Sequence, residues 1–449
     1  MADITAELLD RFADRLDTRA IIVDYDAIPK GIPALKEHLG GGTWLVAVDD
    51  NTWEAAGRTL AGALDAAGLT WRRYDVPNYK HGDAPFCDDE AVEAFERALE
   101  DGAFSAGIAV GSGTINDIVK LASCRKSLPM AVVCTAPSMN GYTSGIAALL
   151  SEGVKTTVPC TAPKVVIADL DVMAESPYRM ICSGLGDLMS KPVSNADWQL
   201  SAILNDSFFS SEAMEIIEAG AAMLEGVAPR LPERDREAVG GLTSSLMLSG
   251  LAMSVAGSSS PASGGEHLIS HYIDMTAHAF NLPNDFHGCQ VGVGTLTTAF
   301  LYERFRAMKA DEIDIDGLVD RLAPWSRYRE ELEERFGPLF EAVVKHAEPA
   351  YPDAETLRAR LGRLIERWDE IVNAVGRTLR TKDSLEAELL SAKCPVRFAE
   401  LGVDRERALS SVTDSKDIRN RYTILHLAWE LGMLEGWAEA ALGELYENN

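Results

Sequence analysis

The chain has 449 residues, which is too long for one ordinary hydrophobic core and predicts two or three domains of roughly 150 residues each. Its formal net charge of −27 repels phosphate backbones and anionic lipids, so we expect neither nucleic acid nor a membrane surface as a partner. Hydrophobic residues make up 47% and charged residues 25%, the balance of a globular chain rather than a disordered one.

The N-terminal segment, residues 1–20, is charged and amphipathic and lacks the apolar core and cleavage site of a secretory signal. No run of about 18 apolar residues occurs, which predicts that nothing spans a membrane. The seven cysteines are scattered and form no C-x-x-C pair, which argues against a disulfide framework or a zinc ribbon. We therefore expect a cytoplasmic protein with reduced cysteines.

The first third of the chain alternates short apolar runs with helical patterns. The helical patterns are Glu54–Ala67 and Asp89–Asp101. The runs that read as buried strands are Trp44–Val48, Thr70–Tyr74, Gly107–Val110, Met130–Cys134 and Lys164–Ala168. Strand and helix alternating at this spacing predict a doubly wound α/β domain over residues 1–172.

After residue 172 the strand signals become scarce, and residues 173–449 are predicted to form an all-helical domain. A charged stretch, Asp311–Arg380, has many Arg/Glu pairs at i,i+4 spacing and is expected to form exposed helices. A last helix is expected near Tyr422–Leu442. The long patterns rich in Ala, Leu and Met are Tyr178–Asn205, Ser211–Leu224, Asp235–Val255, Gly265–Phe280 and Val291–Met308.

Two loops of the first domain have the composition of a nucleotide site. Gly111-Ser-Gly-Thr-Ile-Asn-Asp117 follows a predicted strand and precedes a helix expected at Asp117–Ser123, where glycines and helix N–H groups can receive a pyrophosphate. The segment 135–145 follows the next strand and is dense in hydroxyl groups. Asp49 ends another strand and can accept hydrogen bonds from adenosine ribose hydroxyls; the N-cap of the following helix suits Asp50 or Asn51 better.

Four of the eight histidines fall between residues 267 and 287. His267 and His271 lie at i,i+4 on a helical pattern, and His287 follows a turn-like segment, so these three can assemble a first-row metal site. Which two of them bind the metal is open at this point. Asp187, at a glycine-to-helix turn, offers the carboxylate that usually joins them, and Lys191 lies one turn further along the same face.

Five segments in this order resemble the glycerol-1-phosphate dehydrogenase family, in particular its bacterial AraM-like branch. They are GSGTINDIVK, TAPSMNGYTSG, SGLGDLMSKPVSNADWQL, GGEHLISHYIDM and HGCQVGVGTL. The resemblance covers roughly residues 20–300 and is weaker near Arg419–Glu435. It places the chain in the superfamily of glycerol dehydrogenases, iron-type alcohol dehydrogenases and dehydroquinate synthases.

The resemblance implies a Rossmann-like N-terminal domain that binds NAD or NADP, followed by a helical domain that binds one divalent metal, either zinc, nickel or iron. By motif position the metal ligands are Asp187, His267 and His287. His271 then faces the substrate, and Asp117, which is paired with Lys120, lies near substrate hydroxyls. The expected catalytic residues are His271, Asp117 and Lys191. The residues expected to line the cofactor are Asp49, Gly111, Gly113, Thr114, Asp117, Thr135, Ser138, Thr143 and Ser144.

The chain departs from the family pattern at Asn140, where the AraM-like sequences often have Asp. The implied reaction is reduction of dihydroxyacetone phosphate to sn-glycerol 1-phosphate, carried out by a homo-oligomer. Two alternatives stay open: the same hydride chemistry on an unphosphorylated polyol or hydroxyketone, and a cyclase of the dehydroquinate-synthase type or a nucleotide-binding protein without catalysis. The basic residues of a dehydroquinate synthase site are not apparent.

Overall fold

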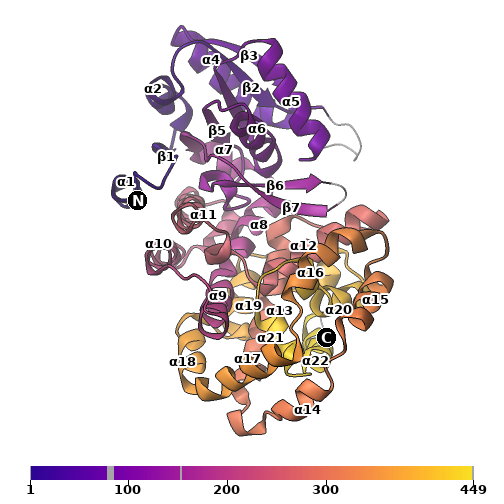
Figure 1. The fold of residues 1–449 in the computed structure, drawn as a ribbon. Helices are drawn as coiled ribbons and strands as arrows, with labels where there is room; N and C mark the ends of the chain where they lie inside the picture. The colour runs from indigo at the N-terminus through magenta and orange to yellow at the C-terminus, as the bar shows by residue number, and fades with distance from the viewer. Residues whose placement is uncertain (1, 78–84, 152–153, 447–449) are drawn as a thin grey trace. The chain divides into compact units, whose positions relative to one another are not determined.

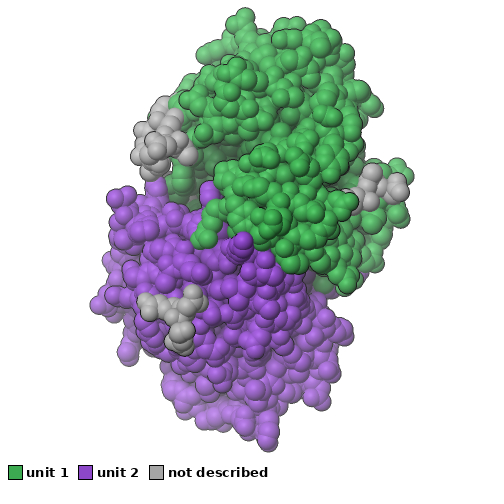
Figure 2. All heavy atoms as spheres, turned by 180° about the vertical axis from the view of Figure 1, so that it is seen from behind, with its two compact units in different colours: residues 1–188, 212–259 green, residues 189–211, 260–449 purple. Residues whose placement is uncertain are grey.

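The computed structural model describes residues 2–77, 85–151 and 154–446 (Figure 1). The chain divides into two compact units, shown in Figure 2: unit 1 contains residues 1–188 and 212–259, and unit 2 contains residues 189–211 and 260–449. The division therefore differs from the predicted split at residue 172. Helices α10 (Ser211–Ala222) and α11 (Arg236–Ala256) belong with the sheet rather than with the helical part of the chain.

Unit 1 is built on a six-stranded parallel sheet with the order β1-β8-β5-β4-β2-β3. The strands, in chain order, are β1 Ala20–Asp24, β2 Thr43–Val48, β3 Thr70–Asp75, β4 Ala106–Gly111, β5 Met130–Cys134 and β8 Val165–Asp169. The central strands β4, β5 and β8 are buried along their whole length, as strands covered on both faces must be. The predicted doubly wound sheet is confirmed, with β1 as an additional strand at one edge.

The strand register brings three predicted cofactor segments to one edge of this sheet. Gly111 at the end of β4 pairs with Cys134 at the end of β5, and the N–H of Thr135 donates to the carbonyl of Gly111 at 3.2 Å. β2, which ends just before Asp49, pairs with the other side of β4. The chain reverses its direction of winding between β2 and β4, and ligands of such sheets bind outside the carboxyl ends at that point.

The helices of unit 1 cover this sheet, with α2 packed on α4 and α5 packed on α6. A two-stranded antiparallel hairpin, β6 (Ile146–Ser151) and β7 (Val154–Pro159), was not predicted and follows the hydroxyl-rich loop. The remaining helices are α1 Ala2–Arg11, α2 Ala27–Leu39, α3 Asp50–Thr52, α4 Arg58–Ala66, α5 Asp89–Asp101, α6 Gly113–Arg125, α7 Leu170–Glu175 and α8 Tyr178–Met189. A π-helical segment, Trp53–Gly57, joins α3 to α4.

Helix α11 is long and apolar enough to cross a membrane by length and composition alone. However, 94% of that stretch is buried within the protein, which identifies α11 as a core helix. Gly250 lies on it, and a Cβ at this position would overlap the Thr143 hydroxyl and the Asn140 carbonyl, so glycine is needed for the 135–145 loop to pack there.

Unit 2 is helical, and α12 packs along α13. Its helices are α9 Lys191–Asn205, α12 Gly265–Phe280, α13 His287–Ala307, α14 Ile315–Asp320, α15 Trp325–Phe336, α16 Phe340–Ala350, α17 Ala354–Glu366, α18 Trp368–Thr378, α19 Lys382–Ser391, α20 Arg405–Thr413, α21 Ile424–Glu430 and α22 Leu434–Leu445. Exposed pairs such as Arg327–Glu331 lie on the helices of the charged stretch, as predicted.

Several of the predicted helices have different limits in the structure. The pattern over 178–205 forms two helices, α8 and α9, because Pro192 fits only in the first turn of a new helix. The pattern expected near 422–442 also divides, into α21 and α22, where Gly432 has a φ of 68°. Helix α13 begins at His287, four residues before the predicted start, so this histidine lies in the first turn of the helix.

Candidate active site

Three histidines of unit 2 lie together on α12 and α13. His267 and His271 are one turn apart on α12, and His287 is the first residue of α13. Their ring centroids are 5.2 Å apart for His267 and His287, 5.5 Å for His271 and His287, and 6.1 Å for His267 and His271. The predicted cluster is therefore present, and the packing of α12 on α13 produces it.

The spacing of His267 and His287 fits a shared metal ion. Two imidazoles that bind one tetrahedral ion at 2.0–2.1 Å have ring centroids about 5.2 Å apart, the separation found for this pair. As the described side chains stand, no three His, Cys, Asp or Glu residues are close enough together to hold a metal ion. The two histidines thus provide two suitably spaced donors, and a third ligand has to come from another residue.

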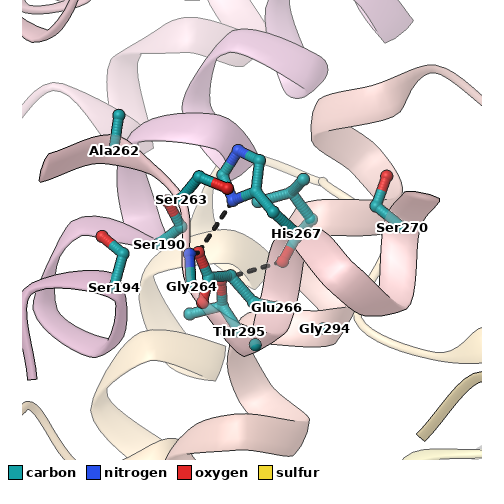
Figure 3. A network of polar contacts seen from close by, with 12 residues as sticks. Ser190, Ser194, Ala262, Ser263, Gly264, Glu266, His267, Ser270, Gly294 and Thr295 are labelled. Carbon is teal, nitrogen blue, oxygen red and sulfur yellow. Dashed lines mark hydrogen bonds and ion pairs between the residues drawn. The ribbon is translucent and has the colours of Figure 1, made fainter. Parts of the chain in front are cut away.

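The ring of His267 is oriented by its neighbour Glu266. The Nδ1 atom of His267 lies 2.7 Å from Oε1 of Glu266, and the two side chains point toward each other (Figure 3). The same carboxylate oxygen accepts a hydrogen bond from the N–H of Gly264 at 2.8 Å. A carboxylate on one ring nitrogen fixes the proton there and leaves Nε2 to bind the metal, the arrangement usual for metal-binding histidines. The residues present therefore fit a divalent ion.

A second buried carboxylate, Asp197 on α9, lies behind the start of α12. Its Oδ2 accepts from the N–H of Gly265 at 2.7 Å, and its Oδ1 accepts from the Tyr302 hydroxyl at 2.7 Å. Burial and the nearby negative charge of Glu266 raise the pKa of Asp197 to about 7. Arg421 is half-buried, donates to the Ser263 carbonyl at 2.6 Å, and has its pKa lowered by loss of solvation. This network has no signal in the sequence, because an acidic residue on a helical pattern normally faces solvent.

Lys191 and His271, two of the expected catalytic residues, differ in their surroundings. Lys191 is buried at the start of α9, where its Nζ donates to the Ser190 hydroxyl at 3.0 Å and to the Ala262 carbonyl at 3.1 Å. His271 is half-buried beside His267 and His287. Lys191 therefore holds the segment that leads into α12, whereas the ring of His271 belongs to the histidine cluster itself.

Asp187, the expected carboxylate ligand, is buried on α8 in unit 1 and is held by Asn140. The side-chain amide of Asn140 donates to Oδ1 of Asp187 at 3.1 Å, and its backbone N–H donates to Oδ2 at 3.0 Å. The helix can approach this loop because residue 184 is glycine, where a Cβ would overlap the Pro137 carbonyl oxygen. Asn140, in place of the Asp often found in the AraM-like sequences, thus provides the Asp187 carboxylate with a neutral hydrogen-bond donor.

The glycine segment forms the predicted strand-to-helix turn, but its helix starts earlier than expected. Helix α6 begins at Gly113, and the Ser112 hydroxyl accepts from the Gly113 N–H at 2.6 Å. A Cβ on Gly111 would lie 2.7 Å from Cβ of Ile115, so the close turn requires glycine there. Gly113 and Thr114 consequently lie in the first turn of a thirteen-residue helix, whose N–H groups favour an anion.

Asp117 and Lys120 of α6 are engaged with backbone atoms. Lys120 is fully buried, and its Nζ donates to the carbonyls of Gly141 at 2.6 Å and Ile146 at 2.9 Å. The Asp117 carboxylate lies 3.5 Å from this ammonium group and accepts from the Ala148 N–H at 3.0 Å. Together these two residues fasten the hydroxyl-rich loop and β6 to α6.

The hydroxyl groups of the 135–145 loop have two different environments. Ser138 lies near the start of α6, with its hydroxyl 3.1 Å from that of Ser112, and Thr135 follows β5 directly. Thr143 and Ser144 are fully buried: Thr143 donates to the Met247 carbonyl at 2.6 Å, and Ser144 to the Gly141 carbonyl at 3.0 Å. The latter two therefore shape the loop from within.

Asp49 forms the N-cap of α3, which corrects the assignment of that role to Asp50 or Asn51. Its Oδ1 accepts from the Thr52 N–H at 2.7 Å, and the Thr52 hydroxyl accepts from the Asp49 N–H at 2.9 Å, completing a capping box. The interpretation was wrong because the helix begins at Asp50, three residues before the expected start near Trp53.

Comparison with known proteins shows to which family this chain belongs. The iron-containing alcohol dehydrogenase family matches residues 22–177. The glycerol-1-phosphate dehydrogenase [NAD(P)+] of Halalkalibacterium halodurans is 31% identical over 353 residues, covering 77% of this chain and 81% of that protein. The enzyme of that name from Bacillus subtilis is 30% identical over 380 residues, covering 84% of this chain and 83% of its own. This chain belongs to the glycerol-1-phosphate dehydrogenase family.

Solved structures show the same fold at lower sequence identity. A probable glycerol dehydrogenase from Sinorhizobium meliloti has a TM-score of 0.62 at 16% identity, covering 95% of this chain and 97% of that one. The glycerol dehydrogenase of Schizosaccharomyces pombe has a TM-score of 0.61, also at 16% identity, covering 96% and 93%. The predicted combination of a Rossmann-like sheet and a helical part is therefore confirmed, as is the family predicted from the five motifs.

Proposed function

We propose that this protein is an NAD(P)-linked, metal-dependent dehydrogenase that reduces dihydroxyacetone phosphate to sn-glycerol 1-phosphate and catalyses the reverse reaction. The observation that carries the proposal is the pair His267 and His287, spaced for one metal ion and backed by the Glu266 carboxylate. Membership of a family whose relatives carry this activity in their names supports the choice of substrate.

The metal site consists of His267 and His287, with Asp187 as the carboxylate ligand indicated by its motif. A divalent ion bound there would polarise the substrate carbonyl and stabilise the charge that develops on its oxygen when the nicotinamide delivers a hydride. His271 gives the proton to that oxygen, a role that the position of its ring beside the other two supports. Lys191 acts by holding the chain segment before α12 in place.

The cofactor site is the carboxyl edge of the unit 1 sheet. The first turn of α6, with Gly111, Gly113 and Thr114, receives the pyrophosphate, since its N–H groups and the helix dipole favour negative charge. Asp49 accepts from the adenosine ribose through the oxygen that does not cap α3. The other residues predicted to line the cofactor lie on or beside the 135–145 loop. Thr135 and Ser138 near its start and Asp117 alongside contact the cofactor, whereas Thr143 and Ser144 are fully buried and support the loop from within.

One assay separates this function from its alternatives. We expect oxidation of NADH or NADPH with dihydroxyacetone phosphate to exceed that with dihydroxyacetone, to stop with a chelator, and to return with zinc, nickel or iron. Equal or greater turnover of dihydroxyacetone would favour an unphosphorylated substrate. Absence of oxidation with either ketone would contradict a dehydrogenase. His278→Ala, on the same helix but outside the cluster, is the control that should keep full activity.

The proposed compartment is the cytoplasm. All seven cysteines are free thiols in the structure, as expected where thiols stay reduced. We further expect a homo-oligomer, which light scattering on the purified chain tests directly.

A further inference from the structure

His287 is linked to two buried polar side chains. The Ser270 hydroxyl oxygen on α12 lies 2.9 Å from Nδ1 of His287, 2.9 Å from Oε1 of Gln290 on α13, and 3.4 Å from the His287 carbonyl. Both Ser270 and Gln290 are fully buried. Because serine has a single hydroxyl proton, it can donate to only one of these acceptors at a time.

The contacts of the Gln290 side-chain amide fix the direction of each hydrogen bond between Gln290, Ser270 and His287. The amide nitrogen of Gln290 faces the Asp274 carboxylate at 3.0 Å and the Asp285 carbonyl at 2.8 Å, and both of these oxygens only accept. The other amide atom of Gln290 is therefore its oxygen, which needs a donor. Ser270 is that donor, so its hydroxyl oxygen accepts a hydrogen bond from the N–H at Nδ1 of His287.

We propose that Ser270 and Gln290 are positioning residues that hold His287 in the Nδ1–H tautomer, so that Nε2 carries the lone pair. Glu266 sets the same tautomer in His267 by a separate contact. Both rings then present Nε2 as the donor nitrogen. The use of this tautomer as a metal donor rests on the proposed function, whereas the tautomer itself is a property of the metal-free chain.

The tautomer can be measured on the metal-free protein labelled with ¹⁵N-histidine, because the two ring nitrogens have very different ¹⁵N shifts in each tautomer. His287→Gln assigns the resonances. We expect His287 to be Nδ1–H in the wild-type chain. In Gln290→Met the serine proton loses its acceptor and turns to Nδ1, so the ring should become Nε2–H. Gln290→Glu, protonated on the oxygen that faces Asp274, keeps an accepting oxygen opposite Ser270 and should retain the wild-type tautomer.

Two further variants separate this role from simple packing. Ser270→Ala removes the acceptor of Nδ1–H and should give a mixture of tautomers. Ser411→Ala deletes another fully buried serine hydroxyl of unit 2, one that donates only to the Ala408 carbonyl, and should leave the His287 shifts unchanged. An unchanged Nδ1–H tautomer in both folded variants, Gln290→Met and Ser270→Ala, would overturn the proposal, as would Nε2–H in the wild-type chain.

Metal affinity gives an independent readout. Competition with a chromophoric zinc chelator should show affinity 10- to 100-fold lower for Gln290→Met than for the wild-type chain, the usual effect of losing a partner of a metal-binding histidine. If the wild-type chain bound no zinc, nickel or iron, the proposed function would fail while the tautomer result stood. If Gln290→Met changed the tautomer but not the metal affinity, the positioning role in metal binding would be contradicted.

Discussion

The two units stabilise their candidate site residues in different ways. In unit 2 the histidine rings contact other side chains: Glu266 for His267, and Ser270 followed by Gln290 for His287. In unit 1 the polar residues mostly bind backbone atoms, as Lys120 binds two carbonyls of the loop and its hairpin. Hydrogen bonds from side chains determine which nitrogen of a histidine ring carries the proton. Hydrogen bonds to backbone atoms instead fix the path of a loop. Loss of a residue in unit 2 should therefore change chemistry first, and loss in unit 1 should change stability first.

The largest expected effect tests the unit 2 side of this comparison. His267→Ala removes a proposed metal donor, and loss of the metal should lower kcat/KM about 10³-fold, because a bound ion contributes several kcal/mol to the transition state. Metal retention should fall to background by elemental analysis, while NAD(P) affinity measured by fluorescence titration should be nearly unchanged. Loss of both metal and cofactor binding would show that the two sites are not separate. His278→Ala is the matched control.

Lys120→Met tests the unit 1 side. It leaves two buried carbonyl oxygens without their cationic donor, and we expect the free energy of unfolding, measured by urea titration, to fall by about 3 kcal/mol. Metal affinity should change little. Lys126→Met, on an exposed ion pair just past the end of the same helix, should cost at most about 1 kcal/mol. A metal affinity that fell as far as in His267→Ala would remove the distinction between the units.

A histidine outside the cluster shows what a purely structural ring does in unit 2. His426 is buried on α21, where its Nδ1 accepts from the Thr423 N–H at 3.3 Å. Burial, together with the positive charge of Lys416, lowers its pKa to about 3. Between pH 6.5 and 3 the unfolded chain binds the proton and the folded chain does not, so stability falls as pH falls.

This dependence can be isolated by comparing the wild-type chain with His426→Asn. Between pH 6.5 and 4.5 the wild-type chain should lose about 2.3 kcal/mol more unfolding free energy than the variant, because the slope rises from about half of 1.36 kcal/mol per pH unit at pH 6.5 to nearly the full value at pH 4.5. Denaturant titrations at the two pH values measure the difference. An equal loss in both proteins would mean that His426 takes up its proton in the folded chain.

Much of the fold could be predicted from the sequence, because buried parallel strands and long apolar helices have strong local patterns. Helix α2 could not, since it contains Pro29, Gly31 and Pro33, and only packing against the sheet makes it helical. Strand β1 has the β-branched run Ile21–Val23, so its signal was present and was missed. Element limits were less accurate, as at His287, where α13 begins four residues before its predicted start.

The residue types of the candidate site could be predicted from the sequence, but the buried residues that hold them in place could not. The histidine cluster followed from i,i+4 spacing and from the concentration of histidines in one segment. The burial of Glu266 and Asp197 did not, because a carboxylate is retained in a core only when distant residues such as Tyr302 and Gly265 supply its donors. Likewise, Thr143 and Ser144 looked like ligand contacts, and only the packing of α11 shows that they are buried.

The smallest effect on metal binding is expected at Asn140. Unlike most polar residues of unit 1, Asn140 orients a charged group, the Asp187 carboxylate, through its side chain. Asn140→Ala removes the amide donor of Asp187 but keeps the backbone N–H at 3.0 Å, so one of the two carboxylate contacts remains. We therefore expect metal affinity to fall about tenfold, at the lower end of the range for such partners, with little change in stability. Ser249→Ala, which deletes only the other contact of this amide, at 3.3 Å, is the matched control and should bind metal as the wild-type chain does. If Asn140→Ala instead lost stability and kept its metal affinity, this residue would belong with Lys120 and the loop supports, and the contrast between the two units would be complete.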